Sequence, residues 1–251
     1  MSAIGPSAIG RSLRLYHAPA RRPLLDAFHR RFLGVGDLAF DIGCHVGDRA
    51  ASFSRIGARV VAVEPQPRLA RALRLIFLGV PDFTLLSTLI GASEGQGVLR
   101  LNSANPTVAT ASQDFIAAAH GAPGWEGQVW DAEIPLPRTT LDALIATHGM
   151  PDFVKIDVEG WEAEVLAGLS RAPRALSFEF TTIQRVVAYA SLERLSALGY
   201  RHFNACLGES MAWQFPAAVK APAMAEWLAG LPDSANSGDI YAAGAAWRLA
   251  A

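Results

Sequence analysis

Short apolar segments alternate with amphipathic segments along most of the chain. Apolar and often β-branched runs predict buried strands at residues 38–42, 59–63, 83–86, 153–158, 175–180, 201–206 and 239–243. Apolar positions at helical spacing predict helices at residues 24–33, 48–56, 68–78, 162–169 and 192–198. Strands that alternate with helices in this way are typical of a parallel, doubly wound sheet, so we expect an α/β fold.

Two segments, at residues 93–138 and 207–238, interrupt this alternation. Residues 93–138 are irregular and rich in Gly, Ser, Asn and Pro, with one short helix expected at residues 114–120. This segment is too short to bury a core of its own, so it is expected to be an excursion from the sheet and not a second domain. We therefore expect a single domain over residues 1–251. It should contain a helical lead-in at 1–35 and insertions at 102–137 and 207–238.

Length, composition and charge exclude several classes of protein. The chain has 251 residues, of which 51% are hydrophobic, and a net charge of −1, so no basic excess favours a nucleic-acid partner. No apolar run reaches the about 18 residues that cross a bilayer, and arginines interrupt the N-terminus where a secretory signal needs an apolar run. Cys44 and Cys206 form neither a zinc motif nor a disulfide framework. A reduced, cytoplasmic setting is expected.

A glycine turn follows the first expected strand. Residues 40–48 have the sequence FDIGCHVGD, and the next expected strand ends at Glu64 and Pro65. Glycine lets the backbone approach a ligand closely. A carboxylate at the end of the second strand can accept hydrogen bonds from ribose hydroxyls. The two features together predict a nucleoside-containing cofactor in a Rossmann-like cleft.

The same turn distinguishes between cofactors. A dinucleotide fold needs a second glycine where this chain has His45, so a pyrophosphate would meet a side chain. No G-K-[ST] follows the turn, as a P-loop requires. The remaining pattern, D-x-G-x-x-x-G from Asp41 to Gly47, resembles motif I of class I S-adenosylmethionine (SAM) methyltransferases. The acidic Asp41 suits the ammonium group of SAM better than a phosphate. An ordinary strand–turn–helix without a ligand is the alternative.

Acidic residues gather at the carboxyl ends of four expected strands. They are Asp41, Glu64, Asp157 and Glu179. Ligands of open α/β sheets bind outside that edge, near the point where the strand order reverses. Charged side chains are rarely buried without a partner, so these carboxylates indicate a ligand, a metal or a cleft. Helix capping is the alternative for each of them taken alone.

A second block of motifs resembles a known family. Thr140-Leu141-Asp142 is followed by DFVKIDVEGWE at residues 152–162 and by VLAG at residues 165–168. With the glycine turn and the Glu-Pro pair, these segments closely resemble the FkbM family of SAM-dependent methyltransferases over residues 38–180 and the last strand. The resemblance implies a Rossmann-like, doubly wound sheet of seven mostly parallel strands with an antiparallel last strand, as in class I methyltransferases. His45, where the family usually has Asn, and the longer segment 102–137 depart from the pattern.

The resemblance also implies a set of cofactor-binding residues, which lie at the ends of the first three strands: Asp41, Gly43, His45, Gly47, Glu64, Pro65, Gln66 and Thr88. The first four would contact the methionine end of SAM. Glu64 would bind the ribose hydroxyls, and the last three would border the adenine. For His45 a role as the catalytic base is the alternative.

Family members commonly methylate hydroxyl oxygens of sugars or polyketide-derived small molecules, so the resemblance implies O-methylation. A hydroxyl is a weak nucleophile and needs a base or a metal. We expect Asp157 to orient the acceptor or take its proton, with Glu159 and Glu179 assisting. An Mg²⁺ ion held by the same three carboxylates is the alternative. Because no spacing rule supports a metal, none is expected.

Three other functions compete with this one. The first is methylation of nitrogen or of a protein, but Asp157-Val158-Glu159-Gly160 stands where many N-methyltransferases have Asn/Asp-Pro-Pro-Tyr. The second is a non-catalytic module that binds SAM or a partner. The third is a nicotinamide oxidoreductase, which His45 disfavours. The insertions 102–137 and 207–238 are expected on the acceptor side, and neither they nor the rest of the chain predicts the acceptor or the oligomeric state.

Overall fold

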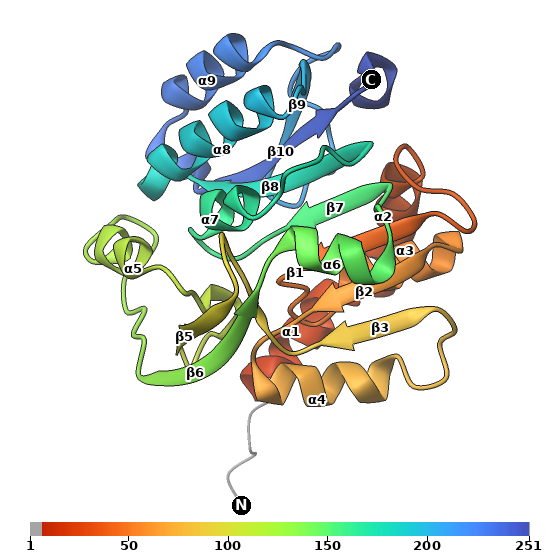
Figure 1. Ribbon diagram of the computed structural model, residues 1–251. Helices are drawn as coiled ribbons and strands as arrows, with labels where there is room; N and C mark the ends of the chain where they lie inside the picture. The colour runs from red at the N-terminus through yellow and green to blue at the C-terminus, as the bar shows by residue number, and fades with distance from the viewer. Residues whose placement is uncertain (1–6, 251) are drawn as a thin grey trace, which may run out of the picture.

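The computed structural model, which describes residues 7–250, is built on one large sheet (Figure 1). Its strands run in the order β3-β2-β1-β7-β8-β10-β9. Their bounds are β1 Leu38–Ile42, β2 Arg59–Val63, β3 Phe83–Leu86, β7 Phe153–Ile156, β8 Ala175–Thr181, β9 His202–Leu207 and β10 Ser237–Ala243. Only β10 is antiparallel to its neighbours, β8 and β9. The predicted seven-stranded, mostly parallel sheet with an antiparallel last strand is confirmed.

The strand order reverses at β1. From β1 the chain first builds the side with β2 and β3, and later returns to place β7 on the other side of β1. In the register of β1 and β7, Asp41 lies opposite Lys155. The carboxyl ends of these two strands therefore flank the crevice in which open α/β sheets bind ligands.

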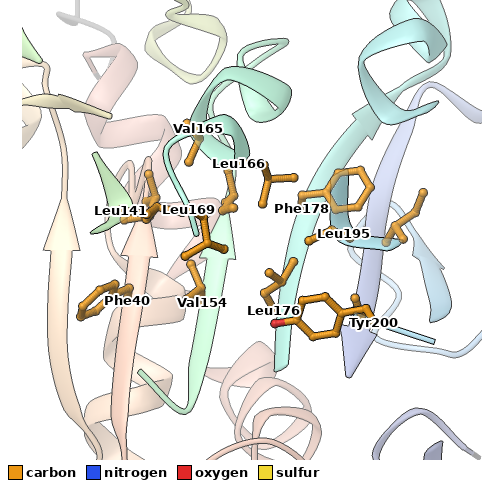
Figure 2. Packing of buried hydrophobic residues seen from close by; sticks show 14 of the residues in the cluster. Phe40, Leu141, Val154, Val165, Leu166, Leu169, Leu176, Phe178, Leu195 and Tyr200 are labelled. Carbon is orange, nitrogen blue, oxygen red and sulfur yellow. The ribbon is translucent and has the colours of Figure 1, made fainter. Parts of the chain in front are cut away.

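Helices cover both faces of the sheet (Figure 1). One face carries α2 (Arg22–His29), α3 (Asp48–Ile56) and α4 (Pro67–Ile76), and the other carries α6 (Leu141–His148), α7 (Glu162–Ala167), α8 (Arg185–Ala197) and α9 (Ala221–Gly230). Alternate strand residues point to opposite faces, so Phe40 and Ala39 of β1 join different buried clusters. Figure 2 shows the first cluster, where Phe40, Val154 and Leu176 from three strands meet side chains of α6, α7 and α8.

Helix α6 begins directly after Thr140, in the Thr140-Leu141-Asp142 segment. The Thr140 hydroxyl accepts a hydrogen bond from the Ala143 backbone N–H at 3.1 Å, which satisfies one of the free donors at the start of α6. Helix α8 begins at Arg185, before the predicted start at residue 192. The first turns of α8 follow directly on the short helix η3 (Thr182–Gln184). The sequence pattern does not change at the boundary between these two helices.

A second, three-stranded sheet, which the sequence pattern did not predict, is formed by the irregular segment together with the short strand that precedes it. Its order is β4-β6-β5, with β4 at Leu89–Ile90, β5 at Gly95–Leu101 and β6 at Ala132–Thr139. Between β5 and β6 lie η2 (Pro106–Val108) and α5 (Gln113–Ala119). These elements surround a small buried cluster of Val108, Phe115, Ala119 and Trp125.

Helix α1 (Ala8–Tyr16) lies within the expected helical lead-in at residues 1–35, whereas α9 lies in the segment 207–238, for which no helix was predicted. Between α1 and α2 lies the short helix η1 (Pro19–Arg21). Across residues 7–250, none of the helices combines the length and apolar character that crossing a membrane requires.

Candidate functional site

A pocket lies at the carboxyl ends of β1, β2, β7 and β8, next to the reversal of strand order. All but one of the residues predicted from the sequence line it: Asp41, Gly43, His45, Glu64, Pro65, Gln66, Thr88, Asp157, Glu159 and Glu179. The structure therefore brings together side chains that are distributed over more than half of the sequence. Helix α1, the segment 106–111 and the start of β10 supply the remaining walls.

The two glycines of the turn have different roles. Gly43 has a φ of +81°, and a Cβ there would lie 1.8 Å from the backbone oxygen of Asp157. Only glycine lets the turn after β1 pack against the loop after β7. Gly47 has a φ of +78° and precedes α3, and its Cβ would meet Leu73 and Phe77 of α4. Gly47 thus faces α4 and lies outside the pocket wall.

Two polar atoms in the turn are buried without a partner among residues 7–250. They are Oδ2 of Asp41 and Nε2 of His45. Burial, reinforced by nearby Asp48, raises the pKa of Asp41 to about 7. Burial also lowers the pKa of His45 to about 4, so its imidazole is neutral near pH 7. An unpaired carboxylate oxygen and an unpaired imidazole nitrogen in one pocket indicate a ligand with both a cationic and an anionic or polar group.

Glu64, directly after β2, connects the turn after β1 with the loop after β2. Its side chain is 2% exposed, and it accepts hydrogen bonds from the backbone N–H groups of His45 at 2.9 Å and Gln66 at 2.7 Å. Burial raises the pKa of Glu64 to about 8, against the effect of these two donors. The Gln66 amide in turn donates to the carbonyl of Pro106 at 2.9 Å, which attaches η2 to the end of β2.

Three carboxyl groups form a cluster at the ends of β7 and β8. Asp157, Glu159 and Glu179 each place one oxygen within 4.8 Å of the others. Burial and the neighbouring carboxylates raise the pKa of Glu159 and of Glu179 well above the ordinary value. Each therefore keeps its proton to a higher pH than an ordinary glutamate does, and the protonated form can donate a hydrogen bond. The cluster is also close enough to share one cation, which is the geometric basis for the Mg²⁺ alternative.

Lys155 supplies the positive charge of this cluster. Its ammonium group donates to Oδ2 of Asp157 at 3.2 Å and to Oδ1 of Asp239 at 2.6 Å. Burial alone would lower the pKa of Lys155, but Asp157, Asp239 and Glu179 outweigh it and hold the pKa above its usual range. Lys155 is therefore a permanent cation beneath the pocket, paired with Asp157 on one side and Asp239 on the other.

The loop after β7 is held in a strained conformation. Glu159 has a φ of +55°, which is rare for a residue with a side chain. Its backbone carbonyl accepts a hydrogen bond from the Thr110 hydroxyl at 2.6 Å. Glu162 accepts from the N–H groups of Val158 at 3.1 Å and Gly160 at 3.2 Å. These contacts keep the Glu159 carboxyl group beside Asp157.

Several pocket residues were not among the sequence predictions. They are contributed by segments outside the recognised motifs and include Tyr16, Trp125, Glu209 and Asp239. The Trp125 indole donates to Oδ1 of Asn236 at 3.1 Å, so the irregular segment contacts the residues that precede β10. The advance signals were the acidic Asp239 in the last expected strand and the expected acceptor-side position of the insertions 102–137 and 207–238, which contain Trp125 and Glu209.

A seven-stranded Rossmann-like sheet with this pocket at its reversal point defines a class I SAM-dependent methyltransferase. The sequence model described as the methyltransferase FkbM domain matches residues 41–201, which is more than half of the chain. The chain therefore belongs to the FkbM family of SAM-dependent methyltransferases. A comparison with curated proteins gave no match.

Solved structures of methyltransferases match the chain at low identity and with TM-scores below 0.5. A precorrin-6Y C5,15-methyltransferase from Geobacter metallireducens is 14% identical with a TM-score of 0.43, and the match covers 88% of this chain and 86% of that one. The magnesium protoporphyrin IX methyltransferase of Synechocystis, with SAM bound, is 11% identical with a TM-score of 0.44, covering 94% and 84%. Aeropyrum pernix fibrillarin, also with SAM, is 13% identical with a TM-score of 0.42, covering 88% and 76%. Similarities at this level carry no argument about the acceptor.

Proposed function

We propose that this methyltransferase acts on a hydroxyl oxygen of a small molecule, such as a sugar or a polyketide-like compound. The observation that carries the proposal is the position of Asp157. This carboxylate lines the same pocket as the turn after β1 and lies beside two carboxyl groups that can donate hydrogen bonds. A base flanked by donors suits an acceptor with one reacting hydroxyl and polar neighbours.

The residues of the first three strand ends fit SAM. The unpaired oxygen of Asp41 is an acceptor for the ammonium group, and the unpaired nitrogen of His45 is a partner for the carboxylate. Glu64 has lone pairs left for the ribose hydroxyls after accepting its two backbone N–H groups. The remaining three predicted residues, Pro65, Gln66 and Thr88, border the adenine. Gly47 has a structural role in this arrangement, because it faces α4.

The carboxyl cluster activates the acceptor. SAM supplies an electrophilic methyl group on a sulfonium when bound, and the protein contributes orientation and proton transfer. Asp157 would accept the proton of the acceptor hydroxyl as its oxygen takes the methyl group, with S-adenosylhomocysteine as the leaving group. Lys155 balances the charge of Asp157 and Asp239. Glu159 and Glu179 donate hydrogen bonds to the acceptor and hold it in line with the methyl group.

The acceptor class can be tested by mass spectrometry. Purified protein and SAM are incubated with a panel of hydroxylated glycosides and macrolactones, with matched amines and with blocked methoxy analogues. We expect a gain of one methyl group on hydroxyl compounds and none on their blocked analogues. The gain should persist in EDTA, because the proposed mechanism activates the hydroxyl by proton transfer to Asp157 and uses no metal. Transfer to amines or to protein only would contradict the proposal, and dependence on added Mg²⁺ would reassign the cluster to a metal.

Cofactor binding is expected to release protons near neutral pH. In the unliganded protein the pKa values of Asp41 and Glu64 are raised to about 7 and about 8 by burial. An ammonium beside Asp41 and ribose hydroxyls on Glu64 both favour the ionised carboxylates, so binding lowers these pKa values. The affinity for S-adenosylhomocysteine should therefore rise between about pH 6 and about pH 7.5, by at most tenfold per unit for each proton released. Calorimetry in buffers of different ionisation enthalpy measures the protons, and proton uptake or a flat pH dependence would contradict this assignment.

A further inference from the structure

The N-terminal helix closes one side of the cofactor pocket, although it precedes the residues that match the family. Tyr16, the last residue of α1, lines the pocket. Figure 1 shows α1 at the edge of the sheet where the arrows of β2 and β3 end. The Tyr16 ring meets the His45 imidazole edge-on, with the ring centroids 5.5 Å apart. Tyr16 thus lies against the turn that we assign to the amino-acid end of SAM.

Contacts from several parts of the chain fasten this helix in place. A ring nitrogen of His17 lies 2.8 Å from the carbonyl oxygen of Val46, in the turn after β1. On the next short helix, Arg21 pairs with Glu209 at 2.5 Å, in the loop after β9. The Arg21 guanidinium also lies over the Tyr16 ring, 5.7 Å from its centroid. Residues 8–21 are therefore attached to two separate loops at the edge of the pocket.

Glu209, the loop residue that pairs with Arg21, is itself bound to the body of the protein. Glu209 accepts a second charge-assisted hydrogen bond from Arg49 of α3 at 2.7 Å, and Arg49 is only 9% exposed. These two arginines outweigh the burial of Glu209 and lower its pKa to about 2. Glu209 is therefore a permanent anion that links Arg21 on the N-terminal segment to Arg49 in the body of the protein.

The amino-acid end of SAM needs donors as well as an acceptor. Asp41 can take its ammonium group, but its carboxylate requires N–H or O–H donors. Burial, reinforced by Glu209, Asp157 and Asp48, raises the pKa of Tyr16 to about 12, so its hydroxyl keeps its proton. The neutral His45 has one ring N–H. Tyr16 and His45, whose rings are in contact, are two neutral donors that line the same pocket as Asp41.

We propose that Tyr16 is a cofactor-binding residue whose hydroxyl donates a hydrogen bond to the carboxylate of SAM, and that residues 8–21 form a lid held over the bound cofactor by the Arg21–Glu209 pair. This inference rests on the proposed placement of the amino-acid end of SAM near Asp41 and His45. It adds to the family's cofactor motifs a residue that lies outside the family-matched part of the chain.

The hydroxyl is tested with two ligands that differ only in the group it would bind. S-adenosylhomocysteine carries the amino-acid end, whereas 5′-methylthioadenosine lacks it. Tyr16→Phe keeps the ring and its packing. It should lower the affinity for S-adenosylhomocysteine by about tenfold and leave the affinity for methylthioadenosine unchanged. The control is Tyr189→Phe on α8, away from the pocket. An equal loss for both ligands, or no loss for either, would overturn the role of the hydroxyl.

The wild-type protein separates this failure from a failure of the cofactor placement. If it bound the two ligands equally well, the pocket would not recognise the amino-acid end, and the assignments of Asp41 and His45 would fail together with that of Tyr16. A preference of the wild-type protein for S-adenosylhomocysteine that Tyr16→Phe leaves intact would remove Tyr16 alone.

The lid is tested by dissociation kinetics. Arg21→Ala removes the ion pair with Glu209 and the contact with the Tyr16 ring. We expect stopped-flow dissociation of S-adenosylhomocysteine to become about threefold faster, the size expected for a partly exposed ion pair. Arg22→Ala, at the exposed neighbouring position, is the control and should leave the rate unchanged. Equal dissociation rates for Arg21→Ala and the wild-type protein would overturn the lid.

Discussion

Replacement of Asp157 by asparagine should lower kcat by about 10²- to 10⁴-fold and leave the affinity for S-adenosylhomocysteine nearly unchanged. Asparagine preserves the size of the side chain but cannot accept the proton of a hydroxyl group. Asp157 belongs to the carboxyl cluster and its contacts are with Lys155, so the turn after β1 and Glu64 are left intact. Steady-state kinetics with the acceptor found in the mass-spectrometric screen, and calorimetry with the product, measure the two effects.

The opposite end of the same strand offers a matched control. Asp152 precedes β7, accepts from the Leu38 backbone N–H at 2.9 Å and pairs with Arg174 at 3.4 Å. Asp152→Asn therefore also removes a charge that faces a cation, but away from the pocket, and kcat should stay near the wild-type value. Unchanged turnover in Asp157→Asn would remove this residue from proton transfer. A parallel loss of cofactor affinity would indicate that the substitution disturbs the pocket as a whole.

Replacement of Glu64 by glutamine should lower the affinity for S-adenosylhomocysteine by roughly tenfold to a hundredfold, because hydrogen bonds to a charged group are worth about 1.5–3 kcal/mol. The charge is lost, and the new NH₂ group would face one of two backbone donors, His45 N–H or Gln66 N–H, that Glu64 accepts. Both loops next to the cofactor would then shift. At saturating SAM, kcat should fall far less than the affinity does.

The control for this variant is Glu133→Gln in β6. Glu133 is exposed and pairs with Arg100 at 3.0 Å, so its loss removes a surface ion pair outside the cofactor pocket. Calorimetric dissociation constants for both variants are compared at one pH, because the protonation of Glu64 contributes to binding. A wild-type dissociation constant in Glu64→Gln would show that the carboxylate does not bind the ribose.

The sequence predicted the main sheet because its strands are short, apolar and bounded by glycines or charges. The bounds of β1, β2 and β3 agree with the prediction residue for residue. The second sheet was missed because β5 and β6 carry Gly97, Pro135 and Pro137, and because Leu99 is the only buried residue of these two strands. Glycine and proline normally mark loops or edge strands, and pairing between two such strands is a tertiary effect.

A site residue was predictable where the direction of its strand alone determines the edge of the sheet at which it lies. Parallel strands end at the same edge, so the acidic residues at the carboxyl ends of β1, β2 and β7 had to meet there. Asp239 reaches this edge for the opposite reason, because β10 is antiparallel and begins where the others end. Tyr16 and Glu209 come from segments without a motif, and only packing places them in the pocket. The direction in which Gly47 faces likewise depends on α4, which the turn motif does not contain.

We propose that this pocket binds SAM through the turn after β1 and Glu64. Isothermal titration calorimetry of the wild-type protein with S-adenosylhomocysteine, SAM and NAD tests this assignment. We predict saturable binding of S-adenosylhomocysteine and SAM at one site per chain and no heat with NAD, since His45 stands where a pyrophosphate would need a glycine. Binding of NAD, with no binding of either SAM or S-adenosylhomocysteine, would contradict the account.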